Sequence, residues 1–199
     1  MKSGEQDRRV KYTKMVLRES LLELMKDKPI TKITPTELCR LADINRNTFY
    51  AHYSSPMDLL STIENELYEE VIQAFECSFH TDTMEILLTE ICQVIRNHSA
   101  ICKILFSEYG DKDFLKRVIY LAHDKTVVEW KTLMHDSSAE MVERLFTFTV
   151  NGSMAIIQDW ILKGAKESPS EIAHFINSVT HYGLRAFTGS NMKTKKQNS

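Results

Sequence analysis

Polar side chains that could contact a nucleic acid are concentrated in the segment RNTFYAHY, residues 46–53. On a helix, Phe49 and Tyr53 lie four residues apart and share the inward face. The side chains left largely outward are those of Arg46, Asn47, Thr48, Tyr50 and His52. Arginine can read guanine, asparagine can read adenine and threonine can touch the thymine methyl group, whereas tyrosine and histidine can hold phosphates. The pattern predicts a helix that enters a DNA major groove; the alternative is a surface helix that is merely polar.

The residues just before this segment carry the signals of another helix. Thr34 can cap it, Pro35 suits its first position, and Glu37 can complete a capping box with Thr34. The expected helix covers residues 34–42, and its inward stripe has the 3-4 spacing of buried positions: Leu38, Leu41 and Ala42.

A tight turn separates the two predicted helices. Asp43 can adopt the left-handed conformation such a turn needs, although less easily than glycine. Asn45 is a good N-cap for the second helix, which is expected over residues 46–52. Two short helices joined in this way form a helix-turn-helix, whose second helix places its N-terminal residues against base edges.

These residues resemble the DNA-binding motif of the TetR/AcrR family of bacterial regulators. The matching positions are Ile33, Thr34, Leu38, Ala42, Ile44, Arg46, Thr48, Phe49, Tyr50, His52, Tyr53 and Leu59, and the resemblance covers roughly the first 65 residues. Two residues depart from the family pattern: Asp43 replaces the turn glycine, and Pro56 replaces a lysine that contacts phosphate in the family. The set expected to contact DNA is Thr34, Thr36, Asn45, Arg46, Asn47, Thr48, Tyr50, His52 and Tyr53.

Composition and helix signals predict an all-α protein with about nine helices. The chain has 199 residues with only six Gly and four Pro. Residues 1–55 carry a net charge of +4 and the remainder −6, which suits a basic module on an acidic body, although +4 is also within ordinary variation. The expected domains are residues 1–55 for DNA binding, residues 56–188 for effector binding and dimerisation, and a disordered tail at residues 189–199.

Apolar periodicity and breakers place the remaining helices. Residues 1–7 are expected to form a loose arm. The expected helices span residues 8–26, 56–79, 84–97, 100–106, 112–135, 139–163 and 169–187. The helix over residues 56–79 has no flexible joint, so it is expected to carry movement between the two modules.

The last two predicted helices have more apolar surface than one inward stripe requires. One side is then expected to face the core and the other a partner chain, although a central core helix would give the same pattern. The resemblance implies dimerisation through these two helices. The expected interface residues are Gly152, Ile156, Phe175, Val179 and Tyr182.

The resemblance also implies an effector held between the helices of the second module. The candidate lining residues are Cys102, Phe106, His123, Trp130, Met134, Phe146 and Met154. Each of these residues would equally suit an ordinary hydrophobic core, and the nine methionines would allow an adaptable pocket.

Several classes of function lack their sequence signals. The seven histidines and four cysteines show no metal-ligand spacing, and nucleophile or phosphate-loop motifs do not occur. We therefore expect no catalytic residues, no metal and no cofactor, and we interpret the cysteines as small buried residues rather than redox sensors. No apolar run approaches the roughly 20 residues that span a bilayer, and no signal-peptide core follows the polar N-terminus, so we expect a cytoplasmic protein.

The combined prediction is a TetR-like transcriptional repressor that binds DNA as a homodimer and is released by a small molecule. A regulator or activator controlled by a protein partner at the second module is the alternative, and a helical enzyme is a more remote one.

Overall fold

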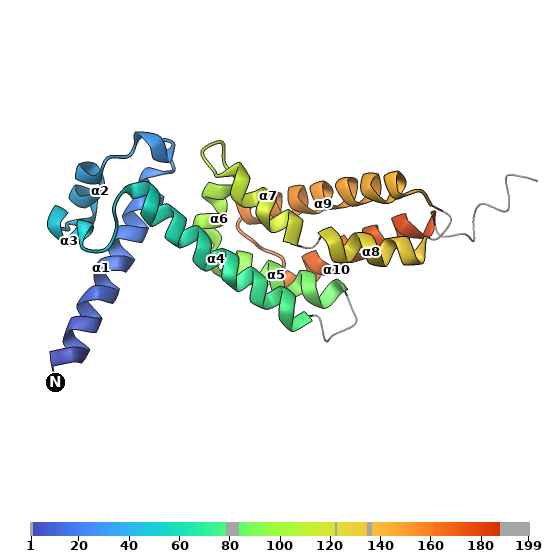
Figure 1. Cartoon of the computed structure of the whole chain (residues 1–199), viewed down its shortest axis with the longest axis horizontal. Coiled ribbons are helices and arrows are strands. Elements are labelled where there is room, and N and C mark those ends of the chain that lie inside the picture. The colour runs from blue at the N-terminus through green and yellow to red at the C-terminus, as the bar shows by residue number, and fades with distance from the viewer. Residues whose placement is uncertain (1, 79–83, 122, 135–136, 188–199) are drawn as a thin grey trace, which may run out of the picture. The chain divides into compact units, whose positions relative to one another are not determined.

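The computed structural model describes residues 2–78, 84–121, 123–134 and 137–187, and the regular structure within these ranges is helical (Figure 1). This confirms the predicted all-α class. The elements are α1 (Lys2–Leu24), a 3-10 turn (Ile30–Lys32), α2 (Pro35–Ala42), α3 (Arg46–Tyr50), α4 (Pro56–Ser78), α5 (Met84–Asn97), α6 (Ser99–Leu105), α7 (Lys112–Leu121), α8 (His123–Leu133), α9 (Ala139–Leu162) and α10 (Pro169–Arg185). None of the described helices combines the length and the apolar character needed to cross a bilayer.

The chain divides into two compact units. The first comprises the residues up to Glu69 together with Ala100–Lys112, and the second comprises Glu70–Ser99 and the residues from Asp113 onward. Helix α4 begins in the first unit and ends in the second. The functional boundary expected between residues 55 and 56 stays a prediction, and the tail expected at residues 189–199 lies outside the described residues.

The core of the first unit is formed where α1 packs on α2 and α2 on α3. Its most deeply buried side chains come from several helices: Leu17, Leu21, Met25, Leu38, Phe49, Leu59 and Ile63. Helix α1 begins at Lys2, so the predicted loose arm is wrong for residues 2–7. A nucleated helix gains a hydrogen bond for each added residue, and this stretch contains no proline to stop it.

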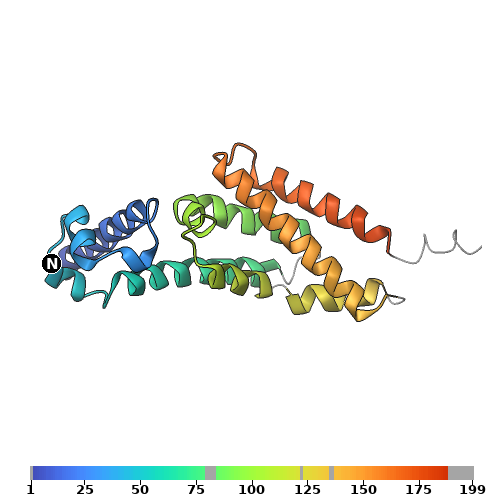
Figure 2. The ribbon, with the colours of Figure 1, turned by 90° about the horizontal axis from the view of Figure 1, so that it is seen from above.

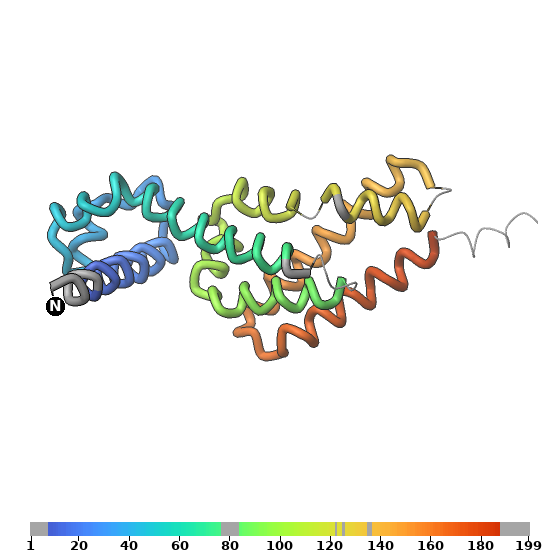
Figure 3. The backbone as a smooth tube through the Cα atoms, turned by 60° about the horizontal axis from the view of Figure 1, so that its bottom comes forward, coloured from blue at the N-terminus to red at the C-terminus, as the bar shows by residue number. Residues whose placement is uncertain are grey.

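The second unit is a bundle in which α8 packs on α9 and α10 packs mainly on α5. Figures 2 and 3 show α10, in orange-red, running beside the green α5. A core cluster joins α8 to α9 and consists of Val127, Trp130, Met134, Val142 and Phe146. Gly164, with a φ of 92°, follows the end of α9 as the sequence predicted.

The helix predicted over residues 112–135 corresponds to α7 and α8, which cover residues 112–121 and 123–133; residues 122 and 135 lie outside the described residues. Phe114 is buried in α7, whereas Val127 and Trp130 are buried in α8.

Candidate functional site

The helix-turn-helix is built by the local interactions that its sequence predicts. The Thr34 hydroxyl oxygen accepts a hydrogen bond from the Glu37 backbone N–H at 3.2 Å, so Thr34 caps α2. The expected capping box is only half formed, because the Glu37 carboxylate accepts instead from Lys28 Nζ. This hydrogen bond from Lys28 lowers the pKa of Glu37. The hydrogen bond between Lys28 and Glu37 thereby connects the N-terminal end of α2 to the segment that follows α1.

The turn between α2 and α3 depends on Asp43, which has a φ of 52° and a ψ of 41°. This is the left-handed conformation predicted for it, and the following residue, Ile44, donates its N–H to the Cys39 carbonyl at 3.0 Å. Helix α3 then begins under the Asn45 cap, whose Oδ1 accepts from the Asn47 N–H at 2.8 Å. Both predictions are confirmed, and together they aim the start of α3 outward.

The aromatic residues of α3 and of the segment that follows it differ in exposure. Phe49 is fully buried and Tyr53 is 7% exposed, whereas Tyr50 is 47% exposed. Burial raises the pKa of the Tyr53 hydroxyl. Tyr53 was predicted both to point inward and to contact DNA; its burial places it in the base that supports the outward residues rather than among them.

The remaining side chains predicted to contact DNA lie at or near the surface. Thr34, Thr36, Asn45, Arg46 and Asn47 are exposed, and Thr48 and His52 are half-buried. Arg46 extends over Tyr50, with its guanidinium carbon 5.8 Å from the ring centroid. The first turn of α3 therefore presents a guanidinium, a carboxamide and a phenol on one edge.

Leu41, predicted to point inward, is 49% exposed, so that prediction is wrong. The buried residues of α2 are Leu38, Cys39 and Ala42. Leu41 lies roughly 100° around the helix from the centre of that arc, which places it outside the core. The 3-4 spacing fitted two possible stripes, and packing on α1 selected the one containing Cys39.

The start of α4 is the point where the sequence departs from the family pattern. Pro56 is buried at the first position of the helix. The Asp58 carboxylate accepts from the Ser54 N–H at 2.7 Å, and the Asp58 N–H donates to the Ser55 hydroxyl at 3.1 Å. At this helix start the chain has a turn that is held by hydrogen bonds of Asp58, whereas the family pattern has a lysine.

A cavity of about 310 Å³ lies inside the second unit, between α5, α7, α8, α9 and α10. Its lining is mostly apolar, with polar groups from α8, α9 and α10: Thr126, Glu129, Thr149, Ser153, Asn177, Thr180 and His181. Of the candidate effector-pocket residues, Trp130, Phe146 and Met154 line it.

Four residues predicted to line the cavity lie elsewhere. Cys102 and Phe106 belong to the first unit, where burial raises the pKa of the Cys102 thiol to about 12. Met134 is in the core cluster, and His123 is bound to two carboxylates. Leu87 and Ile91 of α5 line the cavity but were not among the residues predicted for it. The sequence carries no signal for their position, because periodicity does not identify the neighbouring helix.

His123 joins α8 to α9 beside the cavity wall. Its Nδ1 lies 2.8 Å from Asp124 Oδ1, and its Nε2 lies 2.9 Å from Glu143 Oε2. The ring also packs edge-on against Phe146, with centroids 4.8 Å apart. The hydrogen bonds with Asp124 and then Glu143 raise the pKa of His123. This geometry suits the doubly protonated imidazolium.

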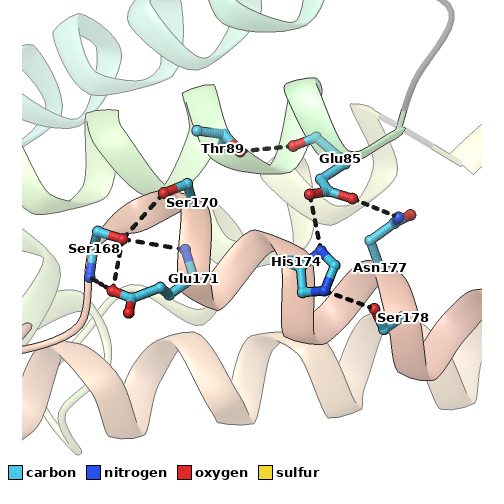
Figure 4. A network of polar contacts seen from close by, with 8 residues as sticks. All are labelled: Glu85, Thr89, Ser168, Ser170, Glu171, His174, Asn177 and Ser178. Carbon is cyan, nitrogen blue, oxygen red and sulfur yellow. Dashed lines mark hydrogen bonds and ion pairs between the residues drawn. The ribbon is translucent and has the colours of Figure 1, made fainter.

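A second set of polar contacts joins α5 to α10 (Figure 4). The Glu85 carboxylate accepts from Asn177 Nδ2 at 3.1 Å and lies 3.0 Å from His174 Nδ1. Because Asn177 also lines the cavity, this network fixes the orientation of one of its polar groups.

An apolar groove of about 490 Å³ runs along the outside of α9 and α10. Of the predicted interface residues, Gly152, Ile156 and Val179 line it, while Phe175 and Tyr182 are exposed on α10 outside the lining. Phe148, also in the groove, is 77% exposed. The extra apolar side predicted for these helices is therefore present on the surface of the chain.

In the described part of the chain, no group of three or more His, Cys, Asp or Glu side chains is arranged to hold a metal ion.

Comparison with known proteins agrees with this geometry. Residues 82–182 match the family model TetR_C_8, described as a transcriptional regulator C-terminal region. No curated protein matches the chain in sequence.

Solved structures of similar fold extend over both units. A TetR transcriptional regulator from Streptococcus agalactiae 2603V is 20% identical, with a TM-score of 0.60 over 89% of this chain and 98% of that chain. A TetR-like regulator from Rhodococcus sp. RHA1 is 13% identical, with a TM-score of 0.61 over 87% and 96%. The dihydroxyacetone kinase operon activator DhaS is 16% identical, with a TM-score of 0.50 over 88% and 98%. At these identities the likeness shows a shared fold.

Proposed function

Because the chain belongs to the TetR family of transcriptional regulators, we propose that it is a DNA-binding repressor that acts as a homodimer and is released by a small-molecule effector. The observation that carries the proposal is the first turn of α3, where Arg46, Asn47 and Tyr50 are exposed above the buried Phe49. Arginine and asparagine are the side chains that read guanine and adenine in the major groove.

The role proposed for α3 follows from how it is held. The Asn45 cap and the left-handed Asp43 direct the first turn of α3 outward. Arg46 and Asn47 would then reach base edges, while Tyr50 and His52 would position the helix on the backbone. Pro56 supplies no cation at the start of α4, so this chain would make one phosphate contact fewer per half-site than the family pattern implies.

The proposed dimer uses the exposed apolar faces of α9 and α10. Phe148, Phe175, Val179 and Tyr182 are all more than half exposed in the single chain. A two-fold interface would cover these side chains and would place two α3 helices on the two halves of an inverted repeat. Phe175→Asp would then yield a monomer with weak operator binding, as measured by sedimentation and fluorescence anisotropy.

The proposed effector site is the cavity lined by Trp130, Phe146 and Met154. Helix α4 is continuous from Pro56 to Ser78 and belongs to both units, so a change in the second unit can reach the first through it. A ligand acts only through its preference for one state, and a 100-fold preference corresponds to about 2.7 kcal/mol per site. Operator DNA must weaken the ligand by the same factor.

DNA binding is tested first, with duplexes from the region flanking the gene of this protein. The wild-type chain should bind one duplex in a footprint with two-fold symmetry, and Asn47→Ala should lose more affinity for that site than for unrelated DNA. Binding without any sequence preference would contradict the proposal.

The switch is tested with Met154→Trp, which should fill the cavity from α9. Operator affinity should remain, and release by compounds found in a screen against the wild type should be lost. Val128→Trp is the matched control, because Val128 is exposed on α8 and lies outside the lining of both cavities. If only a protein partner changes operator affinity, the small-molecule role is wrong.

The sign of regulation is tested by transcription from the bound promoter. The neighbour DhaS is named as an operon activator, so the same fold serves activation in that protein. Loss of transcription when this gene is deleted would assign activation here; increased transcription is the expected result.

A further inference from the structure

The cavity and the groove of the second unit, both partly open to solvent, share a wall. Thr149 and Ser153 of α9 line both spaces, and so do Ile176, Thr180 and Leu184 of α10. A residue that borders both spaces separates them by the thickness of one side chain. Three of the five have short polar side chains, so this wall is thin.

The outer side of the wall is uncovered in the single chain. Helix α10 packs mainly on α5 and less closely on α9, which leaves the seam between α9 and α10 open along its outer side. Gly152 and Gly183 border the groove, and a Cβ atom added to either would meet nothing within 4 Å. Backbone as well as apolar side chain is therefore accessible there.

The residues that line the groove indicate what covers it. They include no charged side chain: Leu145, Phe148, Thr149, Gly152, Ser153, Ile156, Ile176, Val179, Thr180, Gly183, Leu184 and Phe187. A two-fold interface brings each patch against its own copy, so any charge near the axis would meet a like charge. A patch that is apolar and uncharged over its whole length suits a second copy of this chain.

We propose that a second copy of the chain completes the outer wall of the effector cavity, so that ligand binding and dimerisation are coupled through Thr149, Ser153 and Thr180. This inference rests on the proposed dimer and effector site. In the monomer the thin wall has water on its outer side and is free to move outward. In the dimer it is held between ligand and partner, so the dimer binds an apolar ligand more tightly.

Coupling of this kind is reciprocal. A ligand that prefers the dimer must strengthen dimerisation by the same factor as dimerisation strengthens the ligand. The route differs from transmission through α4, because it needs neither DNA nor the first unit. Through this route, a ligand in the cavity acts directly on α9 and α10, the helices of the proposed dimer interface.

The test uses Nile red, an apolar fluorescent probe, with full-length protein. Phe175→Asp should produce monomer without altering either lining, since Phe175 borders neither space. Its affinity for Nile red should fall about ten-fold relative to the wild-type dimer. The matched control is Val128→Asp, which also replaces an exposed apolar residue of the second unit by an acid and should bind like the wild type.

Two further measurements keep the result interpretable. Met154→Trp should abolish probe binding in both the wild-type and the Phe175→Asp backgrounds, which locates the probe in the interior cavity rather than in the groove. Dilution of the wild type through its dimer dissociation range should reproduce the weaker binding without any substitution, so a misfolded variant cannot produce the result.

Equal probe affinity in monomer and dimer, with Met154→Trp still abolishing binding, would overturn the shared wall and leave the effector cavity standing. Binding that survives Met154→Trp in the wild type would place the probe outside the cavity and would count against the effector site itself. A wild type that is monomeric at all concentrations would overturn both the dimer and this inference.

Discussion

The guanidinium of Arg46 lies over the ring of Tyr50, and its Nη2 donates a hydrogen bond to the Tyr50 hydroxyl at 3.4 Å. The two residues are one turn apart on α3, and both are exposed. A cation over an exposed aromatic ring gains about 0.5–1 kcal/mol. Tyr50 therefore limits the directions in which Arg46 points before any DNA is bound.

This contact predicts a graded loss of operator affinity. Arg46→Ala should cost about 1–3 kcal/mol at the preferred site and less on unrelated DNA. Tyr50→Phe keeps the ring under Arg46 and should cost less than Tyr50→Ala, as measured by fluorescence anisotropy at fixed salt. Arg144→Ala, an exposed arginine on α9, is the control. Equal losses for both Tyr50 variants would show that the ring does not position Arg46.

Because Asp43 has a left-handed backbone conformation, its replacement by glycine and by alanine should change the free energy of unfolding in opposite directions. Its φ of 52° is accessible to glycine without a Cβ clash, and aspartate tolerates it better than alanine does. Asp43→Gly should be neutral or stabilise by up to about 1 kcal/mol, and Asp43→Ala should destabilise by about 1 kcal/mol. Urea denaturation with unchanged m-values checks both. An alanine variant as stable as the wild type would mean that the turn relaxes out of the left-handed conformation.

His123 predicts a pH-dependent contribution to stability. Its pKa is raised above 6.5 by Asp124 and Glu143, and the neighbouring Tyr120 and Phe146 rings pack beside it. The stabilisation is therefore fully present below the unfolded pKa and is lost as pH rises through the higher folded pKa. His123→Gln should lose more unfolding free energy at about pH 6 than at about pH 9.

The control for this pH dependence is Val128→Gln, because Val128 is exposed on α8 and carries no ionisable group. Its difference from the wild type should vary little between the two pH values. A His123→Gln penalty that stays constant with pH would show that the two carboxylates do not bind a protonated ring.

The hydrogen bonds of Ser168 are expected to stabilise the N-terminus of α10. The Ser168 hydroxyl oxygen accepts from the Glu171 N–H at 3.3 Å, and the Ser168 N–H donates to the Glu171 carboxylate at 2.7 Å (Figure 4). Ser168→Ala should cost about 1 kcal/mol, whereas Ser168→Asp should retain most of the stability because aspartate is also a good N-cap. Thermal unfolding followed by circular dichroism measures the difference. If alanine and aspartate behave alike, the cap is not the origin of the effect.

Much of the candidate DNA-binding site was predictable from sequence, because its determinants are local. The Thr34 and Asn45 caps bind backbone groups two or three residues away, and Asp43 needs only its own backbone conformation. Burial of Phe49 and Tyr53 follows from their i,i+4 spacing on a helix with one inward side. The same spacing failed for Leu41, where two stripes fitted and the neighbouring helix chose between them.

The cavity was much less predictable, because its lining depends on which helices become neighbours. Cys102 and Phe106 have the apolar character of a pocket wall but belong to the first unit, while Leu87 and Ile91 have the same character and line the cavity. None of these relationships is encoded within a few residues of the side chain concerned.

The sequence by itself determined the starts of α2, α3 and α10, the left-handed turn and the polar edge of α3, since each depends on hydrogen bonds and steric limits within about one helical turn. It also determined that α9 and α10 carry more apolar surface than one side can bury. Only the tertiary structure decided which side chains of these two helices line the cavity, which remain exposed, and that five of them border both the cavity and the groove. Side-chain contacts between helices distant in sequence set that outcome. An amphipathic stripe shows that one face of a helix must be buried, but it does not identify the helix that buries it.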